Sequence, residues 1–258
     1  MIERFKQFIE QEDLFSSGDR ILLAVSGGVD SVVMAHLFYH AGFDFEIAHC
    51  NFNLRGKESD EDELFVKGNA GCYGKNFHST RFDTEQFADE HKLSIQEAAR
   101  ELRYSWFAEI LEKENLQYVA TAHHINDSVE TVIYNLVKGT GIKGLRGIPT
   151  KNGTVVRPLL FATRDEILNY AKEKELTYRE DSSNKELKYN RNLIRNEVVP
   201  KLEQINPSFI STFSENIYRF KEVDKLYNQR IEQLKNELVV EDDGCCKINI
   251  KLLKKIDT

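Results

Sequence analysis

The residues best suited to chemistry follow an apolar run near the N-terminus. Directly after Ile21–Val25 the chain reads Ser-Gly-Gly-Val-Asp-Ser. Two adjacent glycines let the backbone approach a ligand, and the free N–H groups of a helix that begins here form an anion site. No G-x-x-x-x-G-K-[ST] loop occurs. The sequence therefore predicts a phosphate-binding turn formed by Ser26, Gly27, Gly28, Val29, Asp30 and Ser31.

Two aspartates are candidates for a place beside the bound phosphate. Asp30 lies within the turn, where a carboxylate would repel the ligand unless Mg²⁺ lay between them, and this ion favours one or two carboxylates plus phosphate oxygens. Asp127, which follows the apolar run Tyr118–Thr121, is the second candidate magnesium ligand. Each also has a structural interpretation: Asp30 as an acidic residue of a first helical turn, and Asp127 with Glu130 as a helix cap.

Histidines and arginines complete the set of candidates. His123 and His124 end the run before Asp127, but further zinc ligands at suitable spacing are absent, so a hydrogen bond from one of them to a ligand is favoured over a metal site. Arg103 falls at the edge of an apolar helix face. The aliphatic part of its side chain can pack on that apolar face while its guanidinium reaches a charged phosphate. Arg100 is the more exposed alternative.

Alternating strands and helices must position these residues. Unbroken apolar runs bounded by turn residues are typical of strands covered on both faces, and the Ser94/Glu97 and Thr163/Glu166 pairs are capping-box patterns that open helices. The pattern predicts an α/β fold with an open, mostly parallel, doubly wound sheet, which binds ligands at the carboxyl ends of its strands. The tips expected to meet there are Ser26–Ser31, His49–Arg55 and Ala122–Asp127.

The chain is expected to divide near Asn206-Pro207. Residues 1–205 are predicted to form the sheet domain, and Ser208–Leu238 has a helical pattern. Cys245–Ile250 resembles a strand without a partner. Residues 206–258 are therefore predicted to be a helical C-terminal arm and the start of a further domain that this chain does not complete.

Composition excludes several classes of protein. With 41% hydrophobic and 30% charged residues and only 4 prolines, the chain is neither disordered nor collagen-like. Its apolar runs are far shorter than the roughly 18 residues of a membrane span, and the N-terminus lacks a signal-peptide core, so we expect a cytoplasmic protein without membrane contact. No C-x-x-C pair occurs among Cys50, Cys72, Cys245 and Cys246, which argues against zinc, iron–sulfur and disulfide frameworks.

The net charge of −7 is unevenly distributed. Thr131–Lys201 holds 14 Lys and Arg against 8 Asp and Glu, a local +6, so the remainder carries −7 − 6 = −13. Lys138–Arg164 is basic, without acidic residues, and interleaved with glycine. It is interpreted either as a solvated face or as a mobile loop that closes over a polyanion. The predicted polyanion contacts are Lys143, Arg146, Arg191 and Arg195.

The turn at Ser26–Ser31 resembles the signature loop of the N-type ATP pyrophosphatases, the PP-loop superfamily. In that superfamily the loop holds the pyrophosphate of ATP while a substrate oxygen attacks the α-phosphorus. An ordered series of further motifs resembles the tRNA(Ile)-lysidine synthetase family, across about residues 20 to 205. The series consists of His49–Ser59, Ala122–Asp127, Gly139–Ile148, Arg157–Leu159, Asp181–Asn184 and Arg191–Arg195.

This resemblance implies an adenine nucleotide α hydrolase-like fold and a ligase that uses ATP and Mg²⁺. The implied reaction joins free L-lysine to carbon 2 of the wobble cytidine of the CAU-anticodon isoleucine tRNA, through an adenylated intermediate, and releases AMP and pyrophosphate. It implies catalytic roles for Asp30, Arg103 and Asp127, an ATP contact for His123, and tRNA as the polyanion. A homodimer is left open.

Three alternative functions remain open. A tRNA thiolase of the same superfamily would deliver sulfur through paired cysteines or an iron–sulfur cluster. A small-molecule amidating synthetase, such as NAD synthetase, would give the basic segment no role. A non-catalytic ATP-binding sensor that resembles universal stress proteins would give Arg103 and Asp127 no role.

Overall fold

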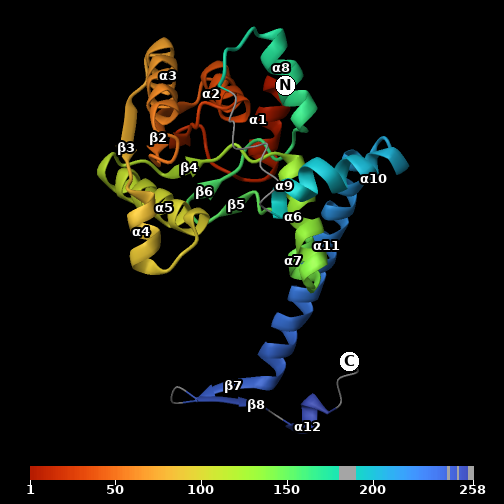
Figure 1. Cartoon of the computed structure of the whole chain (residues 1–258). Coiled ribbons are helices and arrows are strands. Elements are labelled where there is room, and N and C mark those ends of the chain that lie inside the picture. The colour runs from red at the N-terminus through yellow and green to blue at the C-terminus, as the bar shows by residue number, and fades with distance from the viewer. Residues whose placement is uncertain (180–189, 243–244, 249, 255–258) are drawn as a thin grey trace.

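A six-stranded sheet forms the centre of the protein (Figure 1). The computed structural model describes residues 1–179, 190–242, 245–248 and 250–254. The strand order is β3-β2-β1-β4-β6-β5, and every neighbouring pair is parallel except the antiparallel β5 and β6, which confirms the predicted sheet. The strands are β1 (Arg20–Ala24), β2 (Asp44–Asn51), β3 (Phe77–Arg81), β4 (Tyr118–Ala120), β5 (Lys151–Asn152) and β6 (Val155–Val156).

The strand order reverses beside β1. The chain passes from β1 to β2 and β3 on one side, then returns through α4 (Thr84–His91) and α5 (Ile95–Lys113) to β4 on the other side. Ile21 of β1 is in register with Phe45 of β2 and with Tyr118 of β4. The loops after β1 and β4 therefore begin side by side and diverge, which opens a crevice at the carboxyl edge of the sheet.

Helices cover both faces of the sheet (Figure 1). Ile21 and Leu23 pack on one face and Leu22 packs against α5 on the other, and all three are 0% exposed. Burial on both faces explains the unbroken apolar run and confirms that prediction. The helices that contribute to the first face are α1 (Ile2–Gln11), α2 (Val29–Ala41), α3 (Lys57–Tyr73) and α8 (Arg164–Glu173).

The C-terminal part is helical, and its long helix extends away from the sheet (Figure 1). Beside the sheet lie α6 (Ile125–Lys138), α7 (Ile142–Leu145), α9 (Asn190–Leu193), a π-helical turn (Ile194–Val198) and α10 (Val199–Ile205). The first half of α11 (Phe209–Leu238) packs against α6 through Ile217. The chain then forms β7 (Val239–Asp242), β8 (Cys245–Ile248) and α12 (Ile250–Leu253).

This region confirms the predicted helical arm and corrects one detail. β8 pairs with β7 in an antiparallel hairpin, so the expectation of a strand without a partner at Cys245–Ile250 is wrong. The domain boundary between residues 205 and 206 stays a prediction. Among the helices of the described ranges, none is long and apolar enough to cross a membrane.

Capping patterns locate several helix starts. The predicted capping boxes at Ser94 and Thr163 are both present, at the starts of α5 and α8. α6 begins differently, because its N-cap is His124 and the carboxylate of Asp127 accepts the backbone N–H of His124 at 2.9 Å. Asp127 thus contributes to the cap from within the first turn. Its predicted capping partner, Glu130, is not part of that cap.

Phe5 packs α1 against α2. It is 0% exposed and contacts Phe38 of α2, with ring centroids 5.3 Å apart. We expect Phe5→Ala to lower the free energy of unfolding by about 3 to 5 kcal/mol, because it leaves a cavity in a packed core. Urea denaturation measures this change. The exposed neighbour Lys6 supplies the control Lys6→Ala, and a loss no larger than that of the control would contradict the packing role.

Candidate active site

The phosphate-binding turn connects β1 to α2, as predicted. Gly28 is the N-cap of α2, and Gly27 adopts a φ of +96°, which favours glycine. The Ser31 hydroxyl accepts the backbone N–H groups of Ser26 and Gly27, each at 3.2 Å, and donates to the carbonyl of Gly28 at 2.8 Å. These bonds close the turn around the N-terminus of α2, where unpaired N–H groups and the helix dipole attract anions.

A cavity of about 320 Å³ opens beside this turn. It brings together six of the predicted residues: Ser26, Gly28, Asp30, Ser31, Arg103 and His123. Gly27 and Val29 are outside its lining, and the Val29 side chain is buried in the core. Ala48, Cys50, Tyr104 and Phe107 supply a largely apolar wall from β2 and α5.

Arg103 reaches the cavity from α5, whereas Arg100 is exposed. The Arg103 guanidinium lies over the ring of Phe52, 5.1 Å from its centroid. This cation–π contact holds a positive charge at the edge of the cavity. The Arg100 guanidinium instead lies over Tyr104, 4.9 Å from the ring centroid. The geometry therefore favours Arg103 over Arg100 as the site residue.

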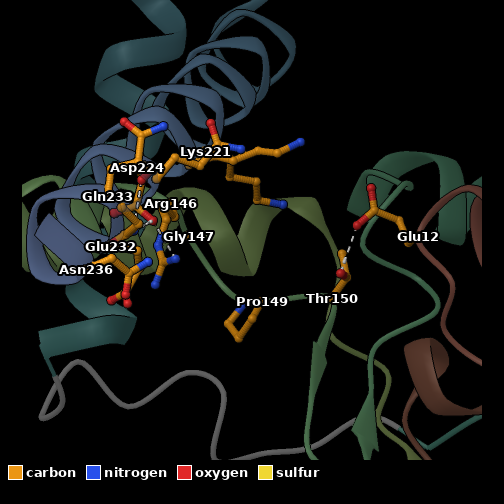
Figure 2. A pocket seen from close by; sticks show the side chains of 13 residues that line it. Glu12, Arg146, Gly147, Pro149, Thr150, Lys221, Asp224, Glu232, Gln233 and Asn236 are labelled. Atoms are coloured by element: carbon orange, nitrogen blue, oxygen red, sulfur yellow. Dashed lines mark hydrogen bonds and ion pairs between the residues drawn. The ribbon is translucent and has the colours of Figure 1, made fainter. Parts of the chain in front are cut away.

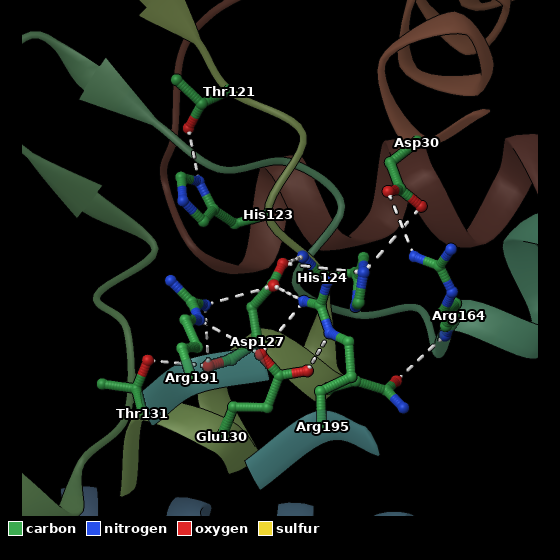
Figure 3. Close-up of polar contacts among 11 residues, drawn as sticks. Asp30, Thr121, His123, His124, Asp127, Glu130, Thr131, Arg164, Arg191 and Arg195 are labelled. Carbon is green, nitrogen blue, oxygen red and sulfur yellow. Dashed lines mark hydrogen bonds and ion pairs between the residues drawn. The ribbon is translucent and has the colours of Figure 1, made fainter. Parts of the chain in front are cut away.

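Asp30 and Asp127 lie on either side of His124 (Figure 3). The His124 Nε2 atom is 3.9 Å from Oδ1 of Asp30 and 3.7 Å from Oδ2 of Asp127. Burial raises the pKa of Asp30 despite the nearby charges of His124 and Arg164. Burial also acts on Asp127, but His124 and Arg191 outweigh it and hold the pKa of Asp127 below its usual range.

His123 points to the cavity and bonds to Thr121, with Nδ1 and Oγ1 2.9 Å apart (Figure 3). Burial lowers the pKa of His123 to about 4. Its imidazole is therefore neutral near pH 7 and has one N–H to donate. A neutral His123 is compatible with the predicted hydrogen bond to a ligand, and a positively charged His123 is not expected.

Arg191 and Arg195, which were predicted to contact a polyanion, do not line the cavity beside the turn; they pair with two carboxylates of α6 next to it. Both donate to Oδ1 of Asp127, at 3.2 and 3.0 Å, and both pair with the carboxylate of Glu130, at 3.1 and 2.7 Å (Figure 3). Glu130 is only 2% exposed. Sequence reasoning missed this function of Glu130. The i,i+4 spacing of the arginines was the available signal, because it places both on one helix face.

Lys143 and Arg146 lie on and just after α7, and neither lines the cavity beside the turn. Lys143 is exposed, but the Arg146 guanidinium donates to the buried carboxylate of Asp224 on α11 at 2.7 Å. Figure 2 shows this pair at one side of a groove of about 970 Å³ between α11 and the sheet domain. Arg146 therefore has a structural partner that its sequence context did not reveal.

One motif of the series, Asp181–Asn184, lies outside the described residues. Arg157, from another motif, is buried and donates to the carbonyl of Pro149 at 2.7 Å, so it supports the chain that follows α7.

Curated relatives cover most of the chain. A tRNA(Ile)-lysidine synthase from Bacteroides thetaiotaomicron is 44% identical over 237 residues, which are 92% of this chain and 56% of that protein. A tRNA(Ile)-lysidine synthase from Chlorobaculum tepidum is 44% identical over 206 residues, which cover 78% of this chain and 62% of that protein. The chain thus spans little more than half the length of the curated relatives it matches.

Solved structures share the fold at low sequence identity. A U34-tRNA thiolase from Methanococcus maripaludis has a TM-score of 0.68 at 19% identity and covers 86% of this chain and 80% of its own. An NH3-dependent NAD synthetase from Campylobacter jejuni has a TM-score of 0.50 at 17% identity, with coverages of 85% and 93%. These likenesses establish the fold alone. The model of the PP-loop domain family, however, matches residues 1–202, so the chain belongs to that family.

Proposed function

We propose that the protein ligates lysine to the wobble cytidine of a CAU-anticodon isoleucine tRNA, with ATP as co-substrate. The observation that carries this proposal is the cavity at the strand-order reversal, where the phosphate-binding turn, Asp30, Arg103 and His123 meet. The similarity to curated tRNA(Ile)-lysidine synthases over 92% of the chain supports the same substrate.

The proposed chemistry proceeds in two displacements. First, the oxygen on carbon 2 of the cytosine attacks the α-phosphorus of ATP; an O–P bond forms, the bond to the β-phosphate breaks, and pyrophosphate leaves. The ε-amine of lysine then attacks carbon 2 and forms a C–N bond, AMP leaves with the oxygen, and the amine releases a proton. Adenylation is needed because a urea-like carbonyl oxygen is a poor leaving group, whereas AMP is a good one.

The side chains around the cavity suit the first displacement. The N–H groups at the start of α2 would hold the pyrophosphate, and Arg103 would stabilise the charge that develops on the α-phosphate. Neutral His123 would donate to a phosphate oxygen. The protein thus contributes position and electrostatics, with no covalent intermediate on its own side chains.

Asp30 fits a magnesium ion better than Asp127 does. The Oδ1 atom of Asp30 is buried without a hydrogen-bond partner in the described part of the chain, as expected for a ligand atom that awaits a cation. The oxygens of Asp127 are already engaged by His124, Arg191 and Arg195. Magnesium would neutralise charge on the phosphate oxygens. Within the described ranges no group of three acidic, His or Cys side chains could hold a metal, which suits an ion held partly by phosphate.

The cavity also bears on the alternative functions. Cys50 lines the cavity, but burial raises the pKa of its thiol to about 12, so the thiolate needed for sulfur transfer is strongly disfavoured. Cys72 is exposed on α3 and is not paired with Cys50. These observations disfavour a thiolase. Asp30 and Arg103 in the cavity disfavour a sensor without catalysis.

Incorporation of labelled lysine into RNA tests the proposal directly. We expect label in the CAU-anticodon isoleucine tRNA only when ATP is present, with one pyrophosphate released for each lysine. The matched control is the same tRNA with a UAU anticodon, which lacks the target cytidine and should remain unlabelled. ATP turnover that does not depend on RNA would contradict the proposal and favour a small-molecule synthetase.

Replacement of Arg103 tests its role in the transition state. We expect Arg103→Ala to lower kcat for lysine incorporation about 10²- to 10³-fold, because the reacting phosphate then lacks one charged donor. Arg100→Ala on the same helix is the matched control and should retain near-normal kcat. Equal effects of the two substitutions, measured by single-turnover kinetics, would refute the assignment.

Charge reversal at Lys143 tests the predicted contact with tRNA. Arg146 is less suitable for this test, because a change of its charge would also break its pair with Asp224. We expect Lys143→Glu to raise KM for tRNA several-fold and to reduce the slope of log affinity against log salt by about 0.7 to 0.9 for each phosphate that is no longer neutralised. Lys6→Glu makes the same charge change on α1. If both variants raise KM equally, the effect is one of net charge alone.

A further inference from the structure

A buried carboxylate lies close to the phosphate-binding turn. Asp62 of α3 is 7% exposed. It does not line the cavity that holds Asp30, but it lines an adjoining cavity of about 510 Å³ together with Ser26, Arg55 and Arg103. Its two oxygens accept from two guanidinium groups: Oδ2 from Arg55 at 2.9 Å and Oδ1 from Arg179 at 2.8 Å. Asp62 therefore connects two segments that are far apart in the sequence.

Each of these segments borders the turn or the cavity. Arg55 belongs to the loop after β2, which also supplies Phe52, the ring beneath Arg103. Arg179 lies in the segment after α8, and its backbone N–H donates to the carbonyl oxygen of Gly27 at 2.9 Å. The carboxylate of Asp62 thus holds the residue whose backbone holds the phosphate-binding turn.

The bond to Gly27 has a geometric consequence for phosphate binding. In a trans peptide the carbonyl of Gly27 and the N–H of Gly28 point in opposite directions. Because Arg179 fixes the carbonyl on one side, the N–H of Gly28 is directed to the other side. There it donates to the Ser26 hydroxyl at 3.3 Å, at the edge of the cavity.

α3 and Arg179 pack beside Gly27 at ordinary van der Waals distances. A Cβ placed on Gly27 would lie 3.4 Å from Phe65 and 3.5 Å from Val66, both on α3, and 3.7 Å from Cγ of Arg179. α3 and Arg179 therefore form the wall against which the turn rests. Without Asp62, the Arg179 guanidinium would keep only its exposed partner Glu61, at 2.8 Å.

We propose that Asp62 is a positioning residue that sets the Gly27–Gly28 peptide for the pyrophosphate of ATP. It acts through Arg179, and through Arg55 it ties the loop after β2 to the same point. This inference rests on the part of the proposed function that places ATP at the turn, and is independent of lysine and tRNA.

Charge and position predict opposite effects of Asp62→Asn. Removal of a negative charge near the turn would, by Coulomb attraction alone, strengthen the binding of a polyphosphate. Removal of the anchor for Arg179 would weaken it, since the Gly28 N–H would no longer be held in one direction. The sign of the change therefore separates a positioning role from a simple field effect.

Calorimetry with two nucleotides on the full chain tests the proposal. The probes are the α,β-methylene analogue of ATP with Mg²⁺, which carries the β- and γ-phosphates, and AMP, which lacks them. We expect Asp62→Asn to weaken binding of the analogue at least 10-fold and of AMP less than 3-fold. Glu61→Gln is the matched control, because Glu61 also pairs with Arg179, at 2.8 Å, but is exposed; it should change analogue binding less than 2-fold.

Unchanged or tighter binding of the analogue by Asp62→Asn, or an equal loss for AMP, would overturn the proposal. If Asp62→Asn does not fold, Arg179→Lys takes its place, because it keeps the positive charge but lacks the guanidinium that pairs with both Asp62 and Glu61; it should show the same selective loss, and normal analogue binding would refute the role. A wild-type chain that binds neither nucleotide would overturn both proposals. Absent lysine incorporation with the expected binding pattern would count against the proposed function alone.

Discussion

The central place of β1 in the parallel sheet is the constraint on which the site depends. β1 pairs with β2 on one side and β4 on the other, and helices bury both of its faces. Its end and the end of β4 are therefore fixed next to each other. The loop after β1 carries the phosphate-binding turn. The loop after β4 carries His123 and leads into the first turn of α6, which holds Asp127, so residues far apart in the sequence meet at this edge of the sheet.

A balanced set of charges then closes the site from the helical side. Asp127 and Glu130 on α6 carry two negative charges, and Arg191 and Arg195 carry two positive charges that pair with them. The two carboxylates are buried, whereas the arginines are partly exposed, so removal of an arginine is costly because it leaves a buried negative charge without compensation. These pairs therefore hold the N-terminal half of α6 against α9 and the π-helical turn, which carry Arg191 and Arg195.

Local patterns predicted the parts of this structure that depend on neighbours in sequence. The capping box at Ser94 and the buried strand β1 are determined by residues that are close together in the sequence, so both could be predicted from it. The partners of Arg146 and Arg195 could not be predicted in this way, because Asp224 and Glu130 lie far along the chain. A count of basic residues cannot separate a free cation from one already paired in the fold.

The second half of α11 extends away from the sheet (Figure 1). Asp224, which receives Arg146, lies near the middle of α11, and the helix continues for 14 residues to Leu238, about 21 Å at 1.5 Å per residue. A tilt of about 10° at the Asp224 anchor would move the β7–β8 hairpin by about 4 Å, from the same helical rise. By this geometry, a small adjustment beside α6 corresponds to a displacement of atomic size at the far end of α11.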